Sequence, residues 1–221
     1  MLDRQVGLEV AARLFRERGY EGASIADLTQ AMGVTPPSLY AAFSSKEELF
    51  RQALDYYVAH ESQRQFDALQ ADMPAFEALA FYLHDVAQRV SDPGKPRGCI
   101  VSTGLLHHAP ESECVARALA ARREASIQAL KARLERARRE GELPGDSDAD
   151  ALARFYAAVA QGMSAQACDG ADTQTLNRLA DVALSAWPGA RAGHPRLNTR
   201  VETNSPFSTS PTATGEPKQT A

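Results

Sequence analysis

Apolar residues recur at helical spacing along most of the chain, and glycine or proline interrupts them at short intervals. Near the start, Val6, Val10 and Leu14 lie four residues apart, as on one face of a helix. We find no run of alternating β-branched residues that would predict a strand. This periodicity predicts an all-α fold of about nine helices, with three short helices preceding a larger helical body.

Capping and helix-breaking residues set the expected limits of these helices. Ser24 and Ser45 each stand three residues before an acidic side chain, which is typical of a capping box at a helix start. Gly19 and Gly33 follow periodic apolar segments and are expected to end them. The predicted helices cover approximately residues 3–18, 24–33, 35–42, 45–72, 76–90, 99–107, 114–141, 148–168 and 172–186.

Charge and cysteine content exclude several classes of protein. The 221 residues include 24 Lys and Arg against 28 Asp and Glu, a formal net charge of −4, which argues against a protein that coats nucleic acid through bulk charge. Three cysteines are too few for a disulfide framework. No stretch approaches ~18 consecutive apolar residues, and the N-terminus lacks the basic and apolar regions of a secretory signal. We therefore expect a cytoplasmic protein.

Composition changes sharply after Trp187. The following 34 residues, 188–221, contain five of the twelve prolines and many Ser and Thr, but few apolar side chains. Such a segment cannot bury enough apolar surface to offset the entropy lost on ordering. We predict that residues 188–221 form a disordered tail.

The most informative window is 24–49, where two helices shorter than three turns are joined at Gly33. This arrangement describes a helix-turn-helix, and Gly33 can adopt the positive φ that the turn needs. The exposed start of the second helix, 35–40, is then free to lie in the major groove of DNA. Four apolar residues are expected to hold the two helices at a fixed angle: Leu28, Met32, Val34 and Leu39.

This window and its flanks resemble the TetR family of transcriptional regulators. The resemblance implies a helix-turn-helix DNA-binding domain over 1–46 and a helical effector-binding and dimerisation domain over 47–187. The run 97–99, Arg-Gly-Cys, also resembles a branch with copper- and redox-responsive members. The residues that match the pattern of the TetR family as a whole are Leu14, Phe15, Gly19, Tyr20, Ser24, Ile25, Gly33, Val34, Thr35, Leu39, Tyr40, Phe43 and the run 45–50.

The resemblance also implies roles for single residues of the helix-turn-helix. Hydroxyl groups on the second helix would contact phosphates or base edges, and a lysine at the start of the next helix would bind a backbone phosphate. The expected DNA-binding residues are Ser24, Thr35, Pro36, Ser38, Tyr40 and Lys46.

For the helical body, the resemblance implies a repressor that binds a pseudo-palindromic operator as a homodimer and is released by a small-molecule effector. Aromatic and polar side chains on the body helices suggest the effector pocket: Tyr57, His60, Phe81, His84, Cys99, Phe155 and Met163. The last two helices would form the dimer interface, through Leu152, Tyr156, Val159, Leu176, Leu179 and Leu184.

Two alternatives compete with this interpretation. One is a metal- or thiol-redox-sensing regulator that uses Cys99, His107 and Cys114, although their spacing matches no strong zinc pattern. The other is a helical metal-binding enzyme that uses His107 and His108. The sequence contains no catalytic motif that we recognise, so we expect no enzyme, no cofactor and no bound metal. We expect the arginines of 114–141 to form a solvated face.

Overall fold

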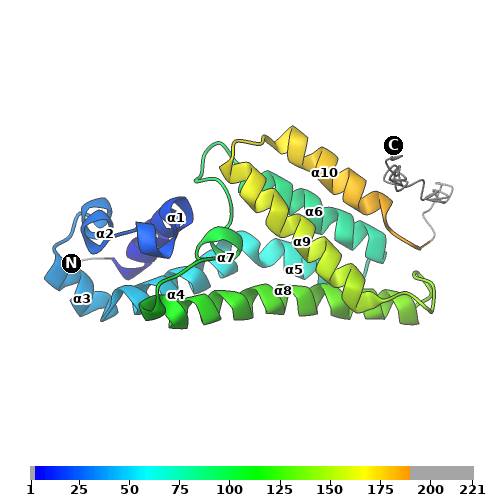
Figure 1. The fold of residues 1–221 in the computed structure, drawn as a ribbon, viewed down its shortest axis with the longest axis horizontal. Coiled ribbons are helices and arrows are strands. Elements are labelled where there is room, and N and C mark those ends of the chain that lie inside the picture. Colours follow the sequence, from blue (N-terminus) through cyan, green and yellow to red (C-terminus); the bar gives the residue numbers. More distant parts are fainter. Residues whose placement is uncertain (1–2, 190–221) are drawn as a thin grey trace, which may run out of the picture.

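The computed structural model describes residues 3–189 and shows an elongated, two-part molecule (Figure 1). A small head contains α1 (Arg4–Gly22), α2 (Ile25–Met32) and α3 (Pro36–Phe43). No strand occurs between residues 3 and 189, which agrees with the predicted all-α class. Residues 190–221, most of the predicted tail, lie outside the described part of the chain.

One long helical segment leads from the head into the body. It begins as α4 (Lys46–Tyr57), passes through a single π-helical turn, η1 (Val58–Ser62), and continues as α5 (Gln63–Gln70). Counted as one helix, this segment brings the described helices to the nine that the sequence predicts. Its first turns pack against α1, and α5 packs against α6 in the body.

Six further elements complete the body. The longest, α8, runs beneath the whole body from the head to the far end, α10 lies on the opposite side, and α9 crosses diagonally between them to pack on α8 (Figure 1). No helix in the described residues is long and apolar enough to cross a bilayer. The elements are α6 (Ala75–Val90), α7 (Ile100–Thr103), η2 (Pro110–Ser112), α8 (Glu113–Arg139), α9 (Ala149–Cys168) and α10 (Thr173–Ser185).

The helix starts follow the capping residues that the sequence displays. Ser24 and Asp27 form a complete capping box at α2, and the Ser45 hydroxyl accepts the backbone N–H of Glu48 at α4. One predicted helix is much shorter than expected. The segment 99–107 is helical only over 100–103, so the two histidines that follow it lie in a loop.

Gly19 sits where α1 turns against α7. Its φ of 71° and ψ of 177° fall in a region that is almost restricted to glycine. A Cβ there would come within 2.9 Å of the Gly104 carbonyl oxygen, which also accepts the backbone N–H of Tyr20 at 2.9 Å. Gly19 therefore allows the last turn of α1 to dock on the segment around α7.

We expect Gly19→Ala to lower the free energy of unfolding by about 1–3 kcal/mol, because the backbone is strained and the docking contact is obstructed. Gly22→Ala, in the same helical turn, is the matched control, since its Cβ would meet only ordinary contact at 3.5 Å. Urea denaturation of both variants measures the difference. Equal stabilities for the two variants would contradict this role of Gly19.

Candidate DNA-binding surface and ligand cavity

The second and third helices form a rigid helix-turn-helix. Gly33 joins them in the left-handed conformation, with φ 66° and ψ 34°, as the sequence predicts. Leu28 and Leu39 are completely buried between the helices, and Phe43 anchors the end of α3. Because its buried residues all lie on one side, α3 presents its opposite side to solvent.

The exposed side of α3 carries hydroxyl groups rather than charges. Thr35, Pro36, Ser38 and Tyr40 are all exposed, and Tyr40 as a whole residue is 46% exposed. The hydroxyls of Thr35 and Ser38 lie 3.0 Å apart and hydrogen bond to each other. These four residues lie together at the start of the helix, where a major groove would meet them.

Lys46 and Ser24 occupy two further helix starts of the head. The Lys46 ammonium lies 4.3 Å from the centre of the Tyr20 ring, and burial lowers its pKa while Glu21 and Asp27 partly offset that effect. Ser24 remains exposed, but its hydroxyl is engaged in the capping box with Asp27. Lys46 is thus a positioned cation, whereas Ser24 is already hydrogen bonded in the free protein.

Other cations of the head are held by their own chain. Arg18 pairs with Asp27 at 2.7 Å, and Arg51 pairs with Glu48. The Arg4 guanidinium lies over the Phe43 ring and bonds the carbonyl of Ala42. The head therefore lacks a broad basic patch, in keeping with the acidic net charge of the chain.

A cavity of about 250 Å³ lies in the body between η1, α5, α6, α8 and α9. Its charged lining residues are Arg89, Arg122 and Arg123, and no carboxylate lines it within the described chain. Arg123 donates 2.9 Å to the Val101 carbonyl, and burial lowers its pKa. The apolar part of the lining includes Val58, Phe66, Tyr82, Val86, Val101, Ala157 and Ala160.

Cys99 lines this cavity and belongs to a hydrogen-bonded cluster. Arg89 donates to the Tyr57 hydroxyl oxygen at 2.7 Å, and that hydroxyl donates to the Cys99 sulfur. Burial alone would raise the pKa of the Cys99 thiol. The Arg89 charge, the Tyr57 hydroxyl and the backbone N–H groups of Ser102 and Val101 outweigh burial and lower it.

Comparisons with known proteins agree with this architecture. Residues 8–53 match the family described as bacterial regulatory proteins, tetR family, and residues 75–183 match the tetracyclin repressor-like C-terminal domain. The HTH-type transcriptional repressor ComR of Escherichia coli (strain K12) is 34% identical, covering 85% of this chain and 90% of its own. The chain belongs to the TetR family.

Two further TetR-family relatives are informative. The HTH-type transcriptional repressor BdcR of Escherichia coli (strain K12) is 33% identical over 81% of this chain and 86% of its own. A cysteine-substituted form of the regulator CifR, solved with a 26-base-pair operator DNA, has a TM-score of 0.82 and 42% identity. That match covers 85% of this chain and 98% of the CifR chain.

Of the predicted pocket residues, only Cys99 lines the cavity, and Tyr57 contacts it through the cluster. Met163 is fully buried in the core, and Phe155 is 42% exposed on α9. His84 bonds Asn177 of α10 at 3.0 Å and so ties two helices together. The other two, His60 and Phe81, are exposed.

The predicted dimer-interface residues fall into two groups. Tyr156, Leu176 and Leu184 are buried in the core of the single chain, so they are not part of its free surface. The other three are only partly buried: Leu152, Val159 and Leu179. Two residues that the sequence reasoning did not assign to this face, Phe155 and Val182, are the large apolar side chains exposed on α9 and α10.

The residues of the metal-sensing alternative do not form a metal site. Cys99 is buried, whereas His107, His108 and Cys114 are exposed. The described residues contain no group of three or more His, Cys, Asp and Glu side chains arranged to hold a metal ion. The prediction that the arginines of α8 form a solvated face is wrong for two of them, because Arg123 is partly buried in the cavity wall and Arg133 is buried. Arg122 lines the cavity but remains exposed.

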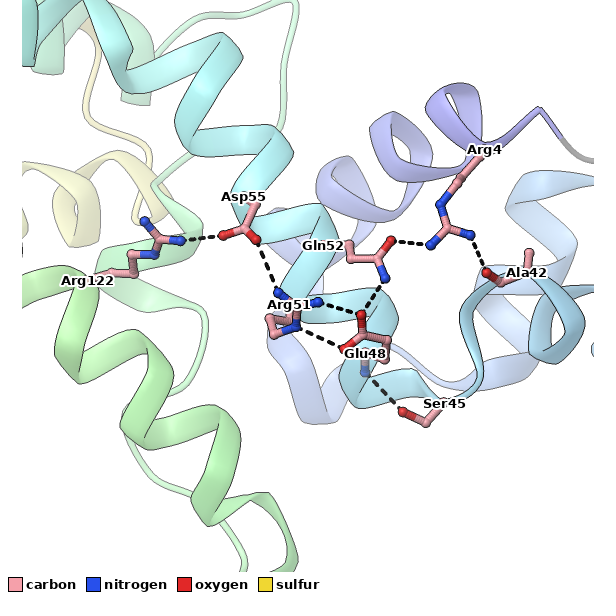
Figure 2. Close-up of polar contacts among 8 residues, drawn as sticks. All are labelled: Arg4, Ala42, Ser45, Glu48, Arg51, Gln52, Asp55 and Arg122. Atoms are coloured by element: carbon pink, nitrogen blue, oxygen red, sulfur yellow. Dashed lines mark hydrogen bonds and ion pairs between the residues drawn. The ribbon is translucent and has the colours of Figure 1, made fainter.

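A chain of polar contacts joins Arg122, at the rim of the cavity, to the end of α3 (Figure 2). Arg122 on α8 pairs with Asp55 on α4, and Arg51 bridges Asp55 to Glu48. The Arg51 and Gln52 hydrogen bonds lower the pKa of Glu48 to about 2. From Glu48, the chain of contacts continues through Gln52 to Arg4 and the Ala42 carbonyl: Gln52 donates to Glu48, and Arg4 donates 2.7 Å to Gln52.

Arg16 provides a second, buried connection between head and body. Its guanidinium donates 2.8 Å to the Gly98 carbonyl, 2.7 Å to the Arg89 carbonyl and 2.9 Å to the Glu61 carboxylate. Arg89 lines the cavity, Gly98 directly precedes the lining residue Cys99, and Glu61 lies in the π-helical turn η1. Arg16 on α1 therefore contacts three segments that border the cavity.

Sequence reasoning missed Arg16, Arg89 and Arg123. Each is an arginine on an otherwise apolar helix face, and that position is the only signal the sequence offers. Lone arginines of this kind usually cover apolar surface with their stems and keep the charge in water. Their inward placement depends on how distant helices pack, which helical periodicity does not report.

We expect Arg16→Met to lower the free energy of unfolding by about 2–4 kcal/mol, because two buried carbonyls and Glu61 lose a charged donor. Arg13→Met is the matched control, since Arg13 is exposed almost one turn earlier on α1 and should change stability by less than about 0.5 kcal/mol. Chemical denaturation measures both values. Similar losses for the two variants would refute the special position of Arg16.

Proposed function

We propose that this chain is a transcriptional repressor that binds a pseudo-palindromic operator as a homodimer and releases it when a small molecule occupies the body cavity. The observation that carries the proposal is the exposed hydroxyl face of α3 beside Lys46, presented by a rigid helix-turn-helix head. Curated relatives that are 33–34% identical, ComR and BdcR, are named transcriptional repressors. A CifR form with 42% identity was solved on operator DNA.

The proposed DNA contacts divide into two kinds. Lys46 binds a backbone phosphate at the start of α4, where free N–H groups and the helix dipole also favour an anion. Thr35, Ser38 and Tyr40 contact phosphates and base edges, with Pro36 fixing the start of the recognition helix. Because one short helix reads only a few base pairs, two heads about 34 Å apart are needed for useful affinity.

Release requires an effector that prefers one arrangement of the heads. A ligand shifts a conformational equilibrium only by its difference in affinity for the two states, typically ~1–3 kcal/mol in allosteric proteins. Both connections between head and body lie next to the cavity. Arg122 lines it at one connection, and Arg89, which accepts a hydrogen bond from Arg16, lines it at the other. Ligand contacts with the cavity wall can therefore change the orientation of the head.

A metal-sensing function, the finer prediction drawn from the copper-responsive branch, has little support, since its three candidate ligands are divided between core and surface. The metal-binding enzyme that would use His107 and His108 has no more support, because the described residues contain no cluster of metal ligands. Thiol sensing at Cys99 needs neither His107 nor Cys114, and the environment of Cys99 supports it separately.

We expect Lys46→Ala to weaken binding to the DNA that flanks the protein's own gene. The slope of the logarithm of the binding constant against the logarithm of salt concentration should become shallower by about one for each head. Specificity for that DNA over unrelated DNA should change little, because a phosphate contact carries no sequence information. Fluorescence anisotropy at several salt concentrations measures both quantities. Arg139→Ala, at the far end of α8, is the control.

An unchanged salt slope for Lys46→Ala would remove Lys46 from the DNA contacts. The same titration tests the whole proposal. If the unaltered protein binds the flanking DNA no better than unrelated DNA at low salt, the repressor function is wrong.

We expect Val182→Glu to convert the dimer into a monomer, because Val182 is 67% exposed in the single chain and lies with Phe155 on the proposed interface. A buried, unpaired carboxylate at the centre of a helical interface is strongly unfavourable. Size-exclusion chromatography with light scattering measures the mass. Gln88→Glu, exposed on α6, should remain dimeric; a dimeric Val182→Glu would contradict this interface.

A further inference from the structure

We propose that Cys99 is a nucleophile that captures a small, neutral α,β-unsaturated carbonyl compound inside the body cavity. The inference rests on the proposed function, because it names the class of effector that the cavity receives. Three observations carry it: Cys99 lines a cavity, a polar cluster favours its thiolate, and the charged residues that line the cavity are all arginines.

The cluster around Cys99 favours the thiolate, which is the nucleophilic form of cysteine. Burial raises the pKa of Tyr57, so its hydroxyl remains protonated and can donate to sulfur. Arg89 in turn donates to the oxygen of that hydroxyl and strengthens it as a donor. A structural cysteine in an apolar core would instead have a raised pKa and would be inert.

The cavity selects the size and polarity of the reactant. A volume of about 250 Å³ holds a small ring or short chain, and the side of the wall formed by Phe66, Val86, Ala157 and Ala160 is apolar. Arg123 lines the cavity, and one of its N–H groups bonds the Val101 carbonyl at 2.9 Å, so its other N–H groups can donate to an oxygen that gains negative charge. The Nε atom of Arg89 is buried and lies 4.0 Å from a carboxylate oxygen of Asp85, too far for a hydrogen bond.

Addition to a conjugated carbonyl balances with these groups alone. The Cys99 sulfur forms a bond to the β-carbon, and the π electrons move to the carbonyl oxygen as an enolate, which faces the guanidinium groups. The proton that the thiol released then returns to the α-carbon. Thiol and alkene become one thioether, so nothing is expelled into the cavity and neither an oxidant nor a reductant is needed.

The position of Cys99 connects this reaction to the head. The segment 98–109 bonds α1 at three points: the Gly98 carbonyl accepts from Arg16, the Gly104 carbonyl accepts from Tyr20, and the Ala109 N–H donates to Glu21. A thioether at Cys99 removes the thiolate charge that Tyr57 and Arg89 favour, and the added group occupies space beside this segment. The adduct therefore acts on contacts that position α1.

The other two cysteines provide internal controls. Cys114 is exposed, and the Glu47 carboxylate raises its pKa. Cys168 is also exposed, and its thiol donates to the Arg97 carbonyl at 3.8 Å. If simple exposure governed reactivity, these two thiols would react before Cys99.

The experiment compares full-length protein carrying Cys114→Ser and Cys168→Ser with full-length protein carrying Cys99→Ser. Each is treated with cyclohexenone near pH 6.5, and adducts are located by intact mass and peptide mapping. We expect one probe molecule on Cys99 and loss of binding to the DNA flanking the gene. Cyclohexanone, which has the same ring but no activated alkene, should add no mass and leave operator binding unchanged.

The role of Arg89 gives a second readout. In Arg89→Met, the rate of Cys99 alkylation near neutral pH should fall about tenfold, and the rise of rate with pH should move upward, as expected for a smaller thiolate fraction. Arg89→Lys should restore part of the rate because it keeps the charge. A variant effect that is only structural would change the rate without moving the pH profile.

The outcomes separate this inference from the repressor function. If the protein binds its operator but Cys99 stays unmodified while Cys114 or Cys168 reacts, the inference is wrong and the repressor function stands. Modification of Cys99 that leaves operator affinity unchanged also overturns it. If operator binding is absent from the start, the repressor function fails, while mass analysis still decides whether Cys99 is the preferred thiol.

Discussion

The buried guanidinium of Arg16 is the interaction on which the arrangement of head and body depends. It satisfies two backbone carbonyls and a carboxylate that belong to three different body segments, yet it is carried by a helix of the head. A buried charge with several charged and polar partners has a narrow range of acceptable geometries. Any movement of the cavity wall at Gly98, Arg89 or Glu61 must therefore either carry α1 with it or break a charge-assisted hydrogen bond.

The acidic charge of the chain limits how its head can bind DNA. Its head has six basic residues and seven acidic ones within 1–52, so non-specific electrostatic attraction is weak. In the proposed function, affinity comes from correctly spaced hydroxyls, helix starts and Lys46 on two heads at once. A protein that binds in this way is sensitive to small changes in head spacing, because bulk charge does not compensate for lost contacts.

The sequence predicts the local features of this fold well. Glycines at helix ends, capping boxes at Ser24 and Ser45 and apolar periodicity are all local, and the corresponding turns and helices form as expected. The ligand cavity is different, because it forms where η1, α5, α6, α8 and α9 meet. Residues such as Met163 and His84 look suitable for a pocket in the sequence but are used for core packing and helix pairing.

The difference between local signals and distant packing also applies to Cys99. The sequence predicts that Cys99 lies in the pocket, but it does not predict the groups that act on its thiol. A cysteine after Arg-Gly is visible in the sequence, but its partners Tyr57 and Arg89 lie 42 and 10 residues away and reach it only through packing. A cavity that bound a carboxylic acid would need its arginines free. Here Arg89 is already committed to Tyr57 and Gln65, so its charge acts on the cysteine. That commitment favours a neutral, thiol-reactive effector over a simple organic anion.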